Sequence, residues 1–223
     1  VDVAVVEVGL GGRLDTTRVV EPAATVLTSI GLDHREILGD TLRQIASDKV
    51  GILRPGVPAV SAPQEPEALA VILAETERLG VPLALVGRDV DCDVVGLGPG
   101  GQDLTIGVRG AGPEPEARYD VRTVLLRPHQ RINATAAVAT ADALRRAGWR
   151  IDAGAVARGM ASARWPGRFE RVGPPGAAGD GPAAVGPAVI VDGAHNPHAV
   201  AALVAALEEA YPRRRRTTLV VGI

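Results

Sequence analysis

The sequence predicts an α/β protein built on a mainly parallel sheet. Two short apolar runs rich in β-branched residues, 1–8 and 24–30, each end in a loop that contains glycine. Nearly continuous apolar runs of this length are typical of strands that are buried on both faces. Helical patterns alternate with such runs, which is the order of a parallel sheet covered by helices. The loops place Glu7, Asp33 and His34 at the carboxyl ends of two strands, where open α/β sheets bind their ligands.

A helix is predicted over residues 41–53, because the apolar residues there recur at helical spacing. Asp40 or Thr41 is the expected N-cap, and Pro55-Gly56 is the expected stop signal.

Lys49 lies on this helix and is the only lysine of the chain, since every other basic residue is arginine. An amine differs from a guanidinium because it can lose its proton when desolvated or act as a nucleophile. It can also react with carbon dioxide to give a carbamate, which is an anionic metal ligand. The residues alone leave two interpretations open, a functional amine or a solvated lysine on the surface of an amphipathic helix.

The remaining elements follow from the same patterns. Strands are predicted at 57–61, 82–86, 188–191 and 217–222, and helices at 65–79, 129–147, 151–162 and 198–210. Two antiparallel strands, 104–109 and 119–125, are expected at the margin of the sheet, in a region broken by glycine and proline. A segment rich in glycine, proline and alanine, 173–187, is interpreted as a flexible loop.

The pattern breaks at Pro166-Gly167, which indicates a domain boundary. Residues 1–165 are therefore expected to form one domain and residues 166–223 the beginning of a second. Arg168 follows the break directly. An arginine at such a hinge suits either a phosphate that it reaches when the domains close or an interdomain salt bridge.

The strand predicted at 188–191 leads through the sequence DGAHNP into a helix. Because a helix N-terminus favours anionic groups, Asp192 and His195 would lie where a polyphosphate binds. Taken alone, the pair could equally be a turn-forming aspartate and a capping histidine. Asn133, near the start of another predicted helix, has local capping as its simplest role.

Composition narrows the function classes. Aromatic residues make up 2% of the chain and the net charge is −2, so neither stacking platforms nor a long-range attraction to nucleic acid or anionic membranes is expected. The single cysteine, Cys92, excludes an intramolecular disulfide framework. No segment resembles a signal peptide or a membrane span, and a reducing cytoplasm is the expected location.

Several motifs together resemble the dihydrofolate synthase/folylpolyglutamate synthase family, ATP-dependent amide ligases related to the Mur ligases of cell-wall synthesis. They are VEVGLGGRLDTT, SIGLDHREILGDTLRQIASDKVGILRPG, HQRxNA, PGRFE and DGAHNP. Their order and spacing are more specific than any single motif. The resemblance implies a Mur-ligase-type ATP-binding domain over 1–165 and the start of a Rossmann-like ligase domain over 166–223.

The resemblance also implies roles for individual residues. Glu7 would bind one Mg²⁺, and His34 with carbamoylated Lys49 would bind a second. The pterin-bearing substrate would be lined by Leu14, Asp15 and Thr16. At the nucleotide, Asn133 would contact the base, Asp192 would hold ATP, and Arg168 and His195 would stabilise the transferred phosphoryl group.

The implied reaction joins L-glutamate to dihydropteroate or to the glutamate tail of a folate through an acyl phosphate made with ATP. The expected state is a monomer. The family's phosphate loop, G-x-x-G-K-x-[ST], does not occur in the sequence. The chain is therefore expected to be a fragment that does not turn over by itself.

Three other classes stay open. Another Mur-type amino-acid ligase is the nearest. A metal-dependent hydrolase could be built from Glu7, Asp33, His34 and His195, because carboxylates and imidazoles also activate metal-bound water. A non-catalytic nucleotide-binding module would bind ATP without coupling it to folate or glutamate.

Overall fold

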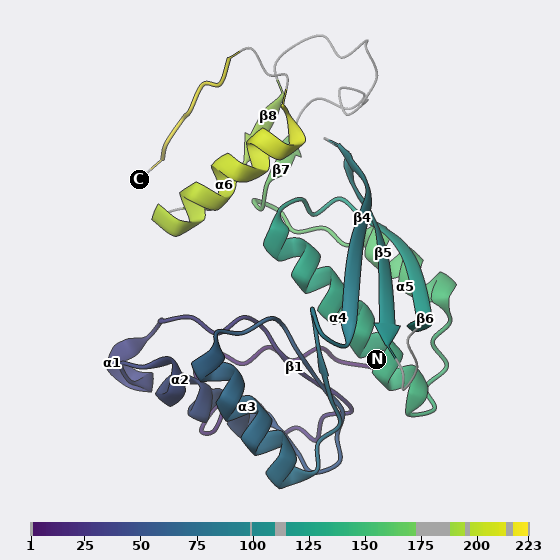
Figure 1. The fold of residues 1–223 in the computed structure, drawn as a ribbon. Helices are drawn as coiled ribbons and strands as arrows, with labels where there is room; N and C mark the ends of the chain where they lie inside the picture. The colour runs from purple at the N-terminus through teal and green to yellow at the C-terminus, as the bar shows by residue number, and fades with distance from the viewer. Residues whose placement is uncertain are drawn as a thin grey trace.

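The computed structural model describes residues 2–98, 100–109, 115–172, 188–194, 197–212 and 216–222. The N-terminal part of the chain contains a parallel sheet of three strands, β1 (Thr25–Leu27, labelled in Figure 1), β2 (Ala59–Ser61) and β3 (Leu83–Leu85), in the order β1-β2-β3. Both strand pairs are parallel. The predicted parallel sheet is therefore confirmed, and its strands are shorter than the apolar runs from which they were predicted.

Helices α2 (Leu42–Lys49) and α3 (Pro66–Leu79) pack on one another beside this sheet. Thr41 is the N-cap of α2 and forms a capping box with Gln44, which satisfies backbone donors at the helix start. The predicted helix over 41–53 continues past Lys49 as a 3-10 segment, η2 (Val50–Ile52). The core between sheet and helices contains Leu27, Ile45, Ala46, Ala59, Ala68 and Ile72. Two shorter segments, η1 (Thr16–Val19) and α1 (Arg35–Leu38), lie in the loops before β1 and before α2.

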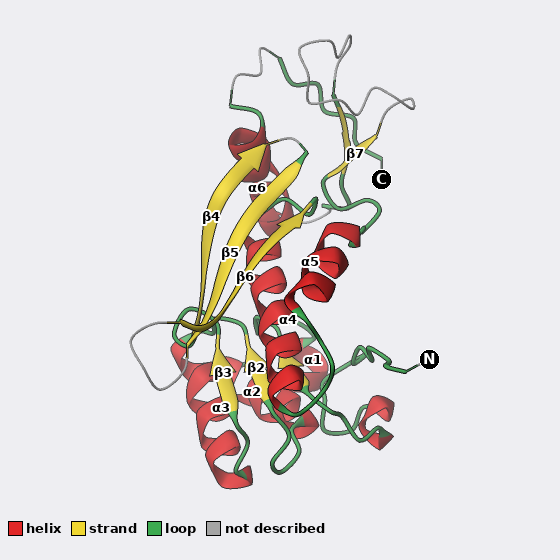
Figure 2. Ribbon diagram, turned by 90° about the vertical axis from the view of Figure 1, so that its right-hand side faces the viewer, coloured by secondary structure: helices red, strands yellow, loops and turns green. Residues whose placement is uncertain are grey.

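A second sheet is antiparallel and consists of β4 (Val90–Gly98), β5 (Gly101–Arg109) and β6 (Pro115–Thr123) (Figure 2). The two antiparallel strands predicted here are confirmed, but their placement at the margin of the parallel sheet is wrong. They form a separate sheet because β4, which sequence analysis missed, supplies a third strand along β5. The glycines of β4 had suggested irregular structure.

Helix α4 (Pro128–Arg146) links the two sheets. One core cluster joins Val60 of β2, Leu104 and Ile106 of β5, and Ala134 and Val138 of α4. The parallel sheet is thus covered on both faces, by α2 and α3 on one and by α4 on the other. Helix α5 (Ala153–Ser162) packs on β6.

The C-terminal part contains the antiparallel pair β7 (Glu170–Val172) and β8 (Val189–Val191) and helix α6 (Pro197–Ala210). A small core joins this part to the segment just before α4, because Leu126 packs with Phe169, Ala206 and Ala210. Strand β7 was not anticipated. The loop predicted over 173–187 lies outside the described residues.

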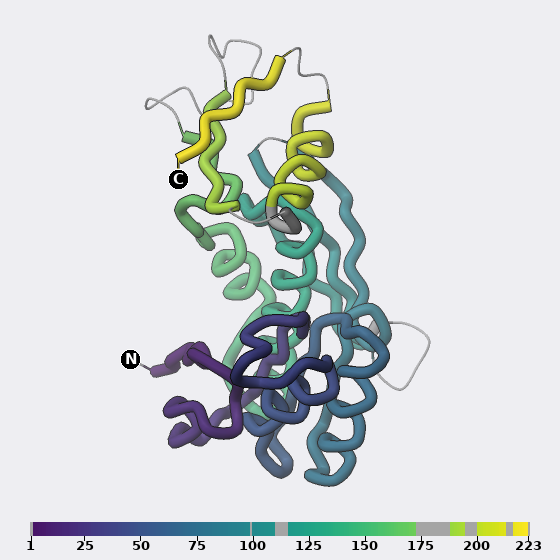
Figure 3. The backbone as a smooth tube through the Cα atoms, turned by 90° about the vertical axis from the view of Figure 1, so that its left-hand side faces the viewer, coloured from purple at the N-terminus to yellow at the C-terminus, as the bar shows by residue number. Residues whose placement is uncertain are grey.

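Two predicted strands are wrong. Residues 2–8 and 216–222 have no strand structure, and they run as irregular chain near the two ends of the trace (Figure 3). Val5 is 98% exposed and Val220 is 89% exposed. An apolar run becomes a strand only where a neighbour supplies hydrogen-bond partners. No strand among the described residues pairs with either segment.

No helix in the described part of the chain has the length and hydropathy of a membrane span.

Candidate active site

The loop after residues 2–8 is organised by the carboxylate of Asp15. Its Oδ2 accepts hydrogen bonds from the backbone N–H groups of Gly9 at 3.1 Å and Leu10 at 3.0 Å. Its Oδ1 accepts from the Thr17 hydroxyl at 2.6 Å and the Thr17 N–H at 2.9 Å. These bonds, the Thr17 hydroxyl first, lower the pKa of Asp15 to about 2. Asp15 is therefore an anion at neutral pH and closes the loop.

The same loop rests on the end of helix α2. A Cβ on Gly12 would lie 2.8 Å from the carbonyl oxygen of Lys49, so only glycine allows this approach. The N–H of Arg13 donates to the carbonyl of Asp48 at 3.1 Å. Lys49, which is half-buried as the last residue of α2, therefore lies directly against the loop that carries Asp15.

The three residues predicted to line a substrate are thus consecutive in a fixed loop. Leu14 is 90% exposed and Thr16 is also exposed, whereas the carboxylate of Asp15 is engaged by its own loop. In this arrangement Leu14 and Thr16 are available to a ligand, and Asp15 holds them in position.

The predicted metal ligands are less well assembled. Glu7 is exposed in the irregular segment 2–8. His34 is exposed, has a left-handed backbone with φ of 48°, and its N–H donates to Asp33 Oδ1 at 2.8 Å. No group of three or more histidine, cysteine, aspartate or glutamate side chains with metal-binding geometry occurs among the described residues. The donor types suit Mg²⁺, but the side chains as described do not converge into a site.

Gln64, which sequence analysis did not single out, fixes the carboxyl edge of the parallel sheet. Its Oε1 accepts from the N–H of Ile30 at 2.9 Å, and its Nε2 donates to the carbonyl of Thr28 at 2.9 Å and to Ser61 Oγ at 3.1 Å. It ties the loop leaving β1, which leads to His34, to the end of β2. The available signal was a polar side chain shortly after a buried strand.

At the other end of the molecule, Asp192 follows β8 and its side chain is 3% exposed. Its Oδ2 accepts from the guanidinium of Arg127 and, at 2.7 Å, from the N–H of Phe169. Its Oδ1 accepts from the N–H of Ala194 at 2.9 Å. Arg127 was not predicted, because it lies far from Asp192 in the sequence. Burial and the nearby charge of Arg168 both lower the pKa of Arg127.

Arg168 and Asp192, both predicted at the nucleotide, come close together. The N–H of Gly193 donates to the carbonyl of Gly167 at 2.8 Å, and a Cβ on Gly193 would lie 3.4 Å from Arg168 Nη1. The Arg168 guanidinium is exposed and lies 5.5 Å from the centre of the Trp165 ring. The exposed guanidinium of Arg168 is thus available to bind an anion close to the buried carboxylate of Asp192.

The other two predicted nucleotide residues are not placed with this pair. Asn133 is exposed on α4, and its Nδ2 donates to Gln130 Oε1 at 3.3 Å. His195 lies outside the described residues.

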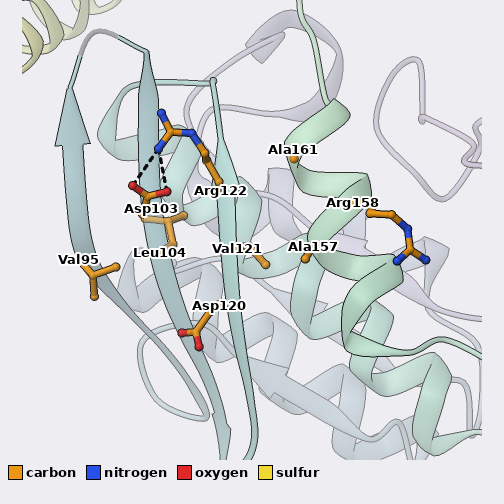
Figure 4. Close-up of a pocket in the computed structure, with 9 residues that line it drawn as sticks. All are labelled: Val95, Asp103, Leu104, Asp120, Val121, Arg122, Ala157, Arg158 and Ala161. Atoms are coloured by element: carbon orange, nitrogen blue, oxygen red, sulfur yellow. Dashed lines mark hydrogen bonds and ion pairs between the residues drawn. The ribbon is translucent and has the colours of Figure 1, made fainter. Parts of the chain in front are cut away.

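An open pocket of about 490 Å³ lies between the antiparallel sheet and α5 (Figure 4). Two of the charged residues that line it pair with each other, because Arg122 Nη1 donates to both carboxylate oxygens of Asp103 at 2.9 Å. It contains none of the predicted site residues, and we assign it no function.

Comparison with known proteins agrees with the sequence motifs. Residues 167–223 match the family described as Mur ligase, glutamate ligase domain. Over 96% of its length the chain is 38% identical to the dihydrofolate synthase/folylpolyglutamate synthase of Bacillus subtilis (strain 168). The chain belongs to the dihydrofolate synthase/folylpolyglutamate synthase family. It spans 46% of that relative, so about half the length of a family member is represented.

Solved members of the dihydrofolate synthase/folylpolyglutamate synthase family have the same fold. The folylpolyglutamate synthase of Mycobacterium tuberculosis complexed with ADP and AMPPCP matches with a TM-score of 0.73 and 36% identity, over 93% of this chain and 44% of that one. An FPGS–AMPPCP–folate complex matches with a TM-score of 0.78 and 32% identity, over 93% of this chain and 47% of that one. The predicted Mur-ligase-like α/β fold is confirmed. The domain division at 165/166 stays a prediction.

Proposed function

We propose that this chain is part of an ATP-dependent amide ligase. The enzyme would add L-glutamate to dihydropteroate, to the glutamate tail of folates, or to both, through an acyl phosphate. The observation that carries the proposal is the meeting of Arg168 and Asp192 in a chain that resembles an FPGS–AMPPCP–folate complex over nearly its whole length. The loop held by Asp15 adds a second, separate place for a ligand.

The chemistry requires that several anions be brought together. A carboxylate oxygen of the folate substrate attacks the γ-phosphorus of ATP, and ADP leaves. The amino group of glutamate then attacks the acyl carbon, loses a proton, and phosphate leaves. In our proposal the exposed guanidinium of Arg168 donates to the transferred phosphoryl group, where a planar cationic fork is most effective. His195 would assist it.

Asp192 and the Asp15 loop would position the two substrates. Asp192 would hold ATP through its carboxylate, whose orientation is fixed by the bonds it accepts from Arg127, Phe169 and Ala194. Asn133 would contact the base from α4. Leu14 and Thr16 would face the pterin-bearing substrate from the loop that Asp15 closes.

We further propose Glu7, His34 and Lys49 as ligands of two Mg²⁺ ions, with Lys49 carbamoylated. When bound, Mg²⁺ would neutralise charge on the phosphates. Lys49 is the only lysine, so its modification is readily measured. Intact-mass analysis at raised bicarbonate should show one added carbon dioxide, and its loss in Lys49→Arg. An unmodified mass at every bicarbonate concentration would contradict the carbamate.

A monomer in a reducing cytoplasm completes the proposal. The cytoplasm rests on the composition, with its single free cysteine, Cys92. Monomer mass in sedimentation would support the first part, and a stable dimer would refute it.

The test is phosphate release from Mg-ATP by the full-length protein, with L-glutamate and either dihydropteroate or tetrahydrofolate. Lys49→Ala removes the amine, and Lys49→Arg keeps the positive charge but cannot form a carbamate. We expect release that needs both co-substrates and is lost in both variants. Arg43→Ala, an exposed change on the same helix, is the control and should keep activity. Release without a co-substrate would indicate a hydrolase, and none at all would reject the ligase.

A further inference from the structure

Three described residues other than glycine have a positive φ, namely His34, Arg127 and Phe169. Two of them meet at one atom, because the Arg127 guanidinium and the Phe169 N–H both donate to Asp192 Oδ2. Residues in such conformations persist only where the surrounding structure holds them, and they cluster at functional sites. Two of the three described non-glycine residues with a positive φ therefore help to orient one carboxylate, that of Asp192.

Arg127 has the more demanding backbone. Its φ of 119° and ψ of 150° belong to a region that is almost exclusive to glycine. Its side chain is 5% exposed and lies 5.8 Å from the centre of the Phe169 ring. Among the described residues, its buried Nε has no hydrogen-bond partner. An arginine that only stabilised the fold would need neither a strained backbone nor a buried donor without a described partner. We therefore attribute both features to the bond that Arg127 makes to Asp192.

The position of Arg127 connects the two halves of the proposed nucleotide site. It is the residue directly before α4, which carries Asn133, whereas Asp192 follows β8. Leu126, its neighbour, packs on Phe169 in the same small core. The ion pair therefore joins α4 to the segment that presents Arg168.

We propose that Arg127 is a positioning residue that, together with the Phe169 N–H, fixes the carboxylate of Asp192 in the orientation that binds the nucleotide. This inference rests on the proposed function, because it takes Asp192 to contact ATP. Arg127 itself does not touch the nucleotide. It acts by holding the carboxylate of Asp192 in one orientation, so its loss weakens nucleotide binding only as long as Asp192 is present.

A double-mutant cycle on the full-length protein tests this, with Mg-AMPPCP binding measured by calorimetry. Arg127→Gly removes the ion pair and leaves a residue that adopts φ 119° without strain, so a loss of binding cannot come from a misfitting backbone. We expect Arg127→Gly to weaken binding about tenfold in the parent background and less than about twofold in the Asp192→Asn background. The KM for ATP should rise with little change in kcat.

Glu209→Gln is the matched control. It breaks another ion pair between α4 and the C-terminal part, the one between Arg131 and Glu209, and should leave the affinity unchanged. If Arg127→Gly does not fold, Arg127→Gln and Arg127→Lys take its place. The glutamine variant should lose about tenfold in affinity, and the lysine variant, which keeps a charged donor, less than about threefold.

Equal losses in both Asp192 backgrounds, or no loss in either, would overturn the inference while leaving the ligase proposal intact. A parent protein that does not bind Mg-AMPPCP would instead refute the proposed function, and the inference with it.

Discussion

Asp142 provides a demanding test of how the structure is held together, because its carboxylate is 1% exposed in α4. Its Oδ1 accepts from the Tyr119 hydroxyl at 2.7 Å and from Arg145 Nη2 at 2.8 Å, and its Oδ2 accepts from Arg146 Nε at 2.6 Å. Asp142→Ala removes all of these bonds. It also leaves the Tyr119 hydroxyl buried between β6 and α4 with no described acceptor.

The cost follows from the exposure of each partner. The bond from Tyr119 is buried and charge-assisted, and its loss should cost about 1.5–3 kcal/mol. Arg145 and Arg146 are 41% and 37% exposed, so each pair adds only about 0–1 kcal/mol. We expect Asp142→Ala to lower the free energy of unfolding by about 1.5–5 kcal/mol. Asp142→Asn, which still accepts a bond from Tyr119, should lose less.

Urea unfolding followed by circular dichroism measures the difference. Asp91→Asn is the control, because it weakens an exposed ion pair with Arg109 on the neighbouring strand and should cost about 0–1 kcal/mol. A loss below about 1 kcal/mol for Asp142→Ala would refute the view that this network is a net stabiliser.

The pH dependence of the free energy of unfolding provides a second test of the stabilisation by Asp142. Burial raises the pKa of Asp142, but the hydrogen bonds from Tyr119, Arg145 and Arg146 outweigh it, so the pKa is lowered. A carboxyl with a lowered pKa in the folded state stabilises above its unfolded value, about 3.9, and loses this contribution as the pH falls through the folded value. The stability gap between the parent and Asp142→Asn should therefore narrow below about pH 4. A gap that widens in acid would contradict the assignment.

Three further predictions concern the candidate site and its supports. Thr41→Ala removes the N-cap of α2 and should cost about 1 kcal/mol in thermal unfolding; no change would mean that the cap is not used. Gly12→Ala places a Cβ 2.8 Å from the Lys49 carbonyl oxygen and should cost about 1–3 kcal/mol, whereas Gly159→Ala, in an open helix position, should stabilise slightly. Because the pKa of Asp15 is about 2, below its ordinary 3.8, the loop should stay closed above about pH 4 and open as the pH falls through 2. An amide resonance that titrates near pH 4 would contradict this.

Elements with local signals could be predicted from the sequence. Helices α3 and α4 begin and end within one or two residues of the predicted bounds, because periodicity, proline at the start and glycine after the end are all local features. Strands β4 and β7 and the ends of the chain could not be predicted as well. Whether an apolar run pairs, and with which strand, depends on partners that are distant in the sequence.

The candidate site shows the same division. The motifs identified Asp15 and Asp192 as residues of interest, but not what holds them. The partner of Asp192 is Arg127, 65 residues away, in a backbone conformation that no local pattern announces for an arginine. Gln64 was likewise invisible, because it bonds to residues up to 36 positions away.

The double role of α4 has a consequence for the order in which the chain folds. Val60 of β2 is 0% exposed because α4 covers it, yet α4 is synthesised long after β2. At about 5–20 residues per second, the roughly 85 residues between β2 and the end of α4 take about 4–17 s to appear on the ribosome. During that interval one face of the parallel sheet remains without its cover. Slowing translation ahead of α4 should therefore increase aggregation of the nascent protein.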